Sequence, residues 1–97
     1  MLTESVIQFC KKELDIPDDT LISVEYLDLS EDNVKGWAID DADDGEYDIE
    51  IEETLSPREI IMTLCHEMVH IKQMVEGRNL DEVEAVEFEE ILYNKFI

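Results

Sequence analysis

The chain contains two histidines, and they stand four residues apart in the segment His66-Glu67-Met68-Val69-His70, which has the form HExxH. On a helix, residues four apart lie on one face with Cβ atoms about 5–6 Å apart, so their imidazole nitrogens can converge on one zinc ion (Zn2+). Zinc lowers the pKa of a bound water towards about 7, and Glu67, rotated off the line of the histidines, can take its proton. The pattern predicts a zinc site at His66 and His70 with Glu67 as general base.

A catalytic zinc ion normally has three protein ligands and a water, and the chain has no third histidine. The third ligand must therefore be an acidic residue or a cysteine. Cys65 is poorly aimed, because it adjoins His66 and neighbouring helix positions point about 100° apart. An antiparallel helix hairpin would bring glutamates of the following segment back beside His70. These candidates are Glu82, Glu84, Glu87, Glu89 and Glu90.

The helix that must carry the motif has strong boundary signals. Ser56 is a typical N-cap, Pro57 suits the first helical position, and Glu59 completes a Ser-x-x-Glu capping box. Apolar residues follow at helical spacing, and Gly77 is a typical stop signal. The two histidines thus fall within a helix that is predicted without reference to them.

Two further helices are expected, one on either side of this central part of the chain. Residues 3–14 carry an apolar stripe at helical spacing, with Thr3 as the cap and Pro17 just beyond the end. A last helix is predicted from about residue 80 to the C-terminus, capped by Asn79 or Asp81.

Three strands are predicted over residues 21–29, 34–40 and 47–53. The last is the clearest, because apolar and acidic residues alternate along it. Turn-like links at residues 30–33 and 41–46 favour a three-stranded antiparallel meander. The expected class is α+β: an N-terminal helix, the meander, the helix with HExxH and a C-terminal helix.

The acidic link suggests calcium at first sight. An EF-hand loop aligned on Gly45 would need ligands where the chain has Ala42 and Ile51, and helices where strands are expected. A hairpin turn with Asp-Gly chemistry is the better interpretation.

Charge and length exclude several classes of protein. With 97 residues, one domain is expected. Seven basic residues stand against 27 acidic ones, giving a formal charge of −20. Nucleic acid and anionic membranes are excluded as direct ligands, because Lys and Arg drive binding to phosphate. The charge favours solubility, or else cationic partners or mimicry of DNA. Cys10 and Cys65 do not make a disulfide framework, and without a signal peptide or transmembrane segment a cytoplasmic location is expected.

The residues around the motif resemble a known group of enzymes. The stretch LCHEMVHIKQ (residues 64–73) and the later DEVEA (residues 81–85) resemble the small gluzincin-type zinc metallopeptidases, including the minigluzincins. The segment from Glu82 to Phe88 is also similar to the second motif of ImmA/IrrE-type metallopeptidases. The resemblance covers residues 47–93 and implies a single zincin-like domain over residues 1–97 that cleaves a peptide or protein substrate.

The resemblance implies that Glu82 is the third zinc ligand, because Ala85 stands three residues after it as in the families' second motif. However, only eleven residues separate His70 from Glu82, fewer than gluzincins usually have, and Glu84 would reach deeper along the hairpin. Both glutamates therefore remain candidates. The resemblance also implies that an edge strand before the active helix, here residues 47–53, holds substrate by β-augmentation. The alternative for this strand is an edge protected by its charges.

Two other functions remain open at this point. One is a protein that binds zinc without catalysis, or a pseudoenzyme that acts through protein contacts. The other is an acidic interaction module, such as an inhibitor or a DNA mimic, in which HExxH is a relic. The presence of Glu67 argues against a relic, because a purely structural zinc site does not need it.

Overall fold

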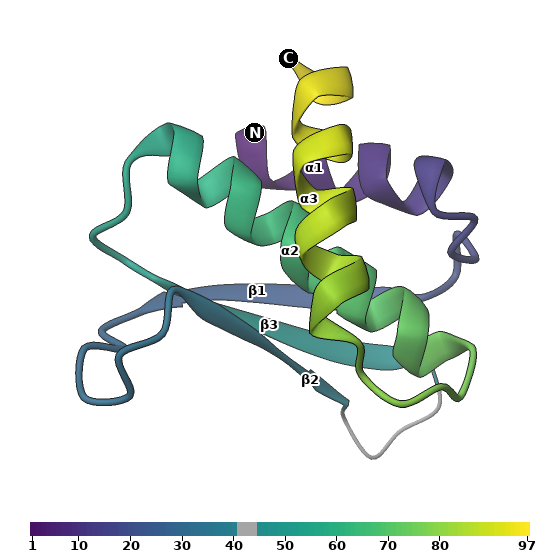
Figure 1. Ribbon diagram of the computed structural model, residues 1–97, viewed down its shortest axis with the longest axis horizontal. Helices are drawn as coiled ribbons and strands as arrows, with labels where there is room; N and C mark the ends of the chain where they lie inside the picture. Colours follow the sequence, from purple (N-terminus) through teal and green to yellow (C-terminus); the bar gives the residue numbers. More distant parts are fainter. Residues whose placement is uncertain (41–44) are drawn as a thin grey trace.

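Three helices cover one face of a three-stranded sheet (Figure 1). The computed structural model describes residues 1–40 and 45–97. In chain order the elements are α1 (Leu2–Glu13), β1 (Leu21–Leu27), β2 (Gly36–Asp40), β3 (Glu46–Glu52), α2 (Pro57–Val75) and α3 (Glu82–Phe96). The predicted α+β class and the order of its elements are confirmed.

The predicted antiparallel meander is wrong. The strand order is β1-β3-β2. β2 pairs antiparallel with β3, as predicted, with Gly36 opposite Ile51. β1 pairs parallel with β3, with Leu21 opposite Glu46. The strand predicted at residues 47–53 is therefore the centre of the sheet, and its backbone is not a free edge for substrate; β1 and β2 form the edges.

The link between β1 and β2 explains this order. It crosses the end of β3 over about 10 Å, two strand spacings, instead of closing a tight hairpin. Hydrogen bonds fasten it to that end: the N–H of Glu52 donates to the carbonyl of Lys35 at 2.8 Å, and the N–H of Glu53 to that of Leu27 at 2.8 Å. The Glu52 carboxylate accepts from the N–H of Leu29 at 2.7 Å. Paired on both sides, β3 buries its apolar face completely.

Residues 41–44 of the turn predicted at residues 41–46 lie outside the described residues. Next to this turn, Asp40 of β2 pairs with Tyr47 of β3 in the antiparallel ladder.

The boundaries of α2 and α3 follow the predicted signals. The Ser56 hydroxyl accepts from the N–H of Glu59 at 3.3 Å, and Pro57 is the first residue of α2. Gly77, just beyond the end of α2, has φ +71°, a conformation that glycine adopts without steric cost. Asp81 caps α3, and its carboxylate accepts from the N–H of Glu84 at 3.1 Å.

The predicted cap of the first helix is wrong. Met1 is the N-cap of α1, and no side chain caps this end. The hydroxyl of Thr3 is instead hydrogen-bonded to the hydroxyl of Tyr26 on β1. A contact between distant parts of the chain has therefore replaced the local one.

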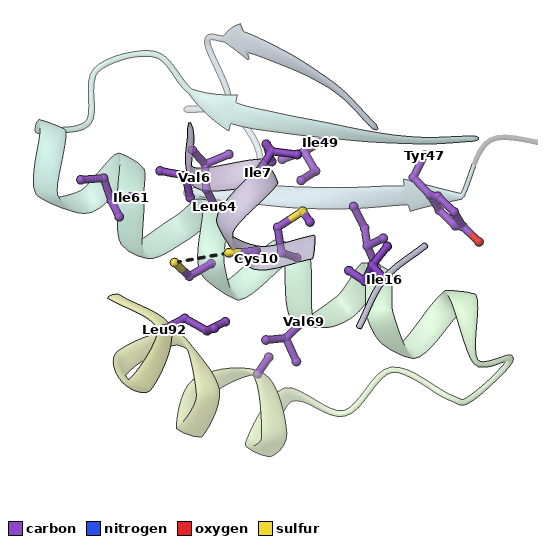
Figure 2. Packing of buried hydrophobic residues seen from close by; sticks show 14 of the residues in the cluster. Val6, Ile7, Cys10, Ile16, Tyr47, Ile49, Ile61, Leu64, Val69 and Leu92 are labelled. Atoms are coloured by element: carbon purple, nitrogen blue, oxygen red, sulfur yellow. Dashed lines mark hydrogen bonds between the residues drawn. The ribbon is translucent and has the colours of Figure 1, made fainter. Parts of the chain in front are cut away.

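The hydrophobic core lies between β3, α1 and α2, with α3 closing it (Figure 2). Ile49 of β3 and Leu64 of α2 are completely buried. Cys10 and Cys65 are buried free thiols with 3.9 Å between their sulfur atoms, as Figure 2 shows. Within residues 1–40 and 45–97, no helix combines the length and apolar character needed to cross a membrane.

Candidate metal centre

Three side chains from two helices converge beside the sheet. The Nε2 atoms of His66 and His70, both on α2, lie 3.1 and 2.6 Å from the two carboxylate oxygens of Glu82, the first residue of α3. One donor atom from each residue lies within 4.8 Å of the others. Two imidazole nitrogens and a carboxylate oxygen at this spacing form a group that could hold a metal ion.

The turn between α2 and α3 brings Glu82 to the histidines. Gln73, completely buried on α2, holds the start of α3 through both ends of its amide. Its Nε2 donates to the carbonyl of Asp81 at 3.1 Å, and its Oε1 accepts from the N–H of Asp81 at 3.0 Å. Since Asp81 caps α3, the next residue begins the helix directly beside the histidine face of α2. Figure 1 shows this end of α3 against the C-terminal half of α2.

Each histidine is also held through its second ring nitrogen. The Nδ1 of His66 lies 2.9 Å from a carboxylate oxygen of Glu89, and the Nδ1 of His70 lies 2.9 Å from Oε1 of Gln73. Both partners are acceptors, so each Nδ1 can donate a proton to them. Each Nε2 faces a second acceptor, the Glu82 carboxylate, and would be unprotonated when it binds a metal ion there. Metal-ligating histidines are typically held in this way.

The structure separates the two candidate glutamates. Glu82 joins the histidines, whereas Glu84 accepts hydrogen bonds from Arg78 at 2.6 Å and from Gln73 at 3.0 Å. The hydrogen bond from Arg78 is the main cause that lowers the pKa of Glu84. Glu84 thus anchors the turn between α2 and α3.

Glu67 lies beside this group and is only 5% exposed. Burial raises its pKa, against the opposing charges of His66 and His70, and the carboxylates of Glu82 and Glu89 add to the rise. Glu67 therefore holds a proton more readily than an exposed glutamate does.

The pKa of His66 is also raised overall. Burial lowers this pKa, but the hydrogen bond to Glu89 and the nearby carboxylates raise it by more.

The group opens into a cavity of about 660 Å³ between α2, the β2 edge and α3. The metal end contains His66, His70, Glu67, Glu82 and Glu89; the first two turns of α2 add Arg58, Glu59 and Met62, and the β2 side adds Lys35 and Trp37.

The sequence predicted Glu89 only as one of five candidate third ligands, whereas the structure places it at Nδ1 of His66. Its spacing of seven residues from Glu82, two helical turns, could have marked it. Arg58 and Trp37 were not predicted as site residues, and Arg58 stands eight residues before His66, about 80° around the helix from it. Trp37 had no comparable local signal, because only the sheet order brings β2 to the site.

No protein-family model, curated protein or solved structure matches this chain. The site itself is what indicates a function: a possible metal-binding group of two histidines and a glutamate, with a buried glutamate beside it, at one end of a cavity.

Proposed function

We propose that this protein is a zinc-dependent metallopeptidase. The observation that carries the proposal is the convergence of His66, His70 and Glu82 within 4.8 Å, with Glu67 in the lining of the same cavity. Two imidazole nitrogens and one carboxylate oxygen make up a common ligand set of catalytic zinc.

The number of donors supports a catalytic site over a structural one. Among the described residues, the group contains three donor residues. Structural zinc sites usually have four protein ligands, whereas catalytic sites have three and leave the fourth position for water or substrate. Nitrogen ligands also favour zinc over calcium or magnesium, which prefer oxygen.

Glu67 is proposed as the general base. When bound, zinc would supply a Lewis acid that polarises the substrate carbonyl and makes a nearby water more acidic. Glu67 takes the proton of the attacking water and later delivers it to the leaving amine. In the metal-free fold burial raises the pKa of Glu67, which makes its carboxylate a stronger base than that of an exposed glutamate.

The free edge for a substrate backbone is proposed to be β2 in place of β3. Gly36, Trp37 and Ala38 of this edge strand line the cavity. An extended peptide could pair with β2 by β-augmentation and pass its scissile bond across the metal end.

The first experiment is elemental analysis of zinc in the native protein and in Glu82→Gln and Glu84→Gln variants. Both variants remove one charge at the start of the same helix without changing side-chain size. We expect near-stoichiometric zinc in the native protein and a large loss in Glu82→Gln. Glu84→Gln should keep its zinc, because the amide oxygen can still accept the hydrogen bonds from Arg78 and Gln73 that anchor the turn.

Peptidase assays on the zinc-loaded protein then test the reaction. Glu67→Gln should retain zinc and lose hydrolysis of a mixed peptide substrate. A native protein that binds no zinc would refute the whole proposal. Zinc binding without hydrolysis of any peptide would favour the non-catalytic alternative.

A further inference from the structure

Arg58 is a cation in the cavity lining, and among the described residues it forms no ion pair with an acidic side chain. Lys35, Lys72, Arg78 and Lys95 each form an ion pair with a glutamate. Within the part of the chain that the structure describes, no carboxylate forms such a pair with Arg58. Lys11 and Lys12 also form no ion pair with the described carboxylates, but neither of them lines this cavity.

The guanidinium of Arg58 lies over the ring of Tyr93 on α3, with 5.6 Å from its central carbon to the ring centroid. This contact restrains the guanidinium at the cavity edge. The ring supplies no carboxylate acceptor, so the N–H donors of the guanidinium remain available in the fork geometry that matches a carboxylate.

The position of Arg58 sets a distance from the metal end. It precedes His66 by eight residues on α2, which is about 12 Å along the helix axis, and both residues line the cavity. An extended peptide advances about 3.3 Å per residue, so Arg58 can reach a group three to four residues from the bond at the metal. Arg58 is also in the first turn of α2, where the helix dipole favours anions.

The charges differ along the cavity, which would favour one direction of a bound peptide over the other. The metal end holds Glu67, Glu82 and Glu89. At the other end the ammonium of Lys35 lies 3.3 Å from the carboxylate of Glu59, whereas Arg58 has no ion-pair partner among the described residues.

We propose that Arg58 binds a carboxylate of the substrate, three to four residues from the scissile bond. The cavity thus selects acidic peptides, although the strongly negative chain would favour basic ones. The inference rests on the proposed peptidase function for its register relative to the scissile bond. The carboxylate is that of an Asp or Glu side chain or of the peptide C-terminus.

Peptide binding can be measured without cleavage. Trp37 is the only tryptophan of the chain and lines the cavity, so its fluorescence reports occupancy. The zinc-loaded Glu67→Gln protein is titrated with matched peptides that carry one Glu, Gln or Lys at successive positions. Each peptide is made with a free and with an amidated C-terminus, which separates the two sources of the carboxylate.

We expect one position, or the free C-terminus, at which the carboxylate tightens binding about ten-fold over its neutral counterpart, the size of one charge-assisted contact. Adding Arg58→Gln should remove this preference, and Arg58→Glu should replace it with a preference for Lys. Lys12→Gln is the matched control, because Lys12 is exposed and outside the cavity lining. It should leave the preference unchanged.

Equal binding of acidic and neutral peptides, no binding of any peptide, or equal effects of Arg58→Gln and Lys12→Gln would overturn the inference. If the contact of Arg58 with Tyr93 is purely structural, Arg58→Gln should have a lower melting temperature and an unchanged ratio of peptide affinities. This result would also overturn the inference. Cleavage by the zinc-loaded native protein separates the two proposals. Discrimination in binding without any cleavage refutes the peptidase and supports carboxylate recognition; cleavage without discrimination does the reverse.

Discussion

Replacing Glu89 should weaken zinc binding although Glu89 is not a proposed ligand. Its carboxylate lies 2.9 Å from Nδ1 of His66 and orients the ring. Loss of such an outer contact typically lowers metal affinity about 10–100-fold, which corresponds to about 1.4–2.7 kcal/mol. Glu89→Ala should lose this amount, and Glu89→Gln less, because the amide oxygen can still accept the hydrogen bond.

Thermal unfolding with and without zinc measures the effect. At zinc one hundred times the native Kd, binding stabilises the native protein by about 2.7 kcal/mol, and Glu89→Ala by only about 0.4–1.4 kcal/mol. For a domain of this size, 1 kcal/mol shifts the melting temperature by about 4–8 °C. The zinc-induced rise should therefore fall from about 11–22 °C to about 2–11 °C.

Glu90→Ala provides the control, because it removes the same charge from the adjacent, exposed position of α3. It should leave the zinc-induced rise unchanged. An unchanged rise in Glu89→Ala, or an equal loss in both variants, would refute the argument that Glu89 acts by holding His66.

Three further predictions concern the pH dependence of the metal-free fold, the close packing at Gly36 and the two cysteines. In the metal-free fold the pKa values of His66 and Glu67 are raised, so their stabilising contribution is complete below the unfolded-state values and is lost as pH rises through the folded ones. The melting temperature of metal-free protein should therefore fall above pH 6.5, the ordinary value for His66; a constant or rising value would contradict this. Gly36→Ala should destabilise the fold by about 1–3 kcal/mol in urea denaturation, because the added Cβ would lie 2.9 Å from a β3 carbonyl oxygen and from a methyl group on α2; an unchanged midpoint would disprove it. The contact between Cys10 and Cys65, with burial, raises the pKa of Cys10, and both thiols should react with an aromatic disulfide reagent only after unfolding; rapid reaction of the native protein would show that they are accessible.

Local sequence was sufficient to predict the helix that carries the site. The cap at Ser56, the proline after it and the stop at Gly77 each act within one helical turn, so no other part of the chain is needed to interpret them. The same holds for the pair His66 and His70, because a helix places residues four apart on one face wherever it lies. The alternation along β3 likewise predicted which of its faces is buried.

Tertiary structure alone decided the partners of these elements. The central place of β3 depends on how the whole sheet buries its apolar face, and the turn signals around it could not reveal that β1 would pair with β3. The choice between Glu82 and Glu84 depends on the orientation of α3 against α2. Ala85 and Leu92 set this orientation by packing into the core, which leaves Glu82 beside the histidines. Side-chain contacts between helices follow from packing over the entire core, and the spacing of residues within one helix does not determine these contacts.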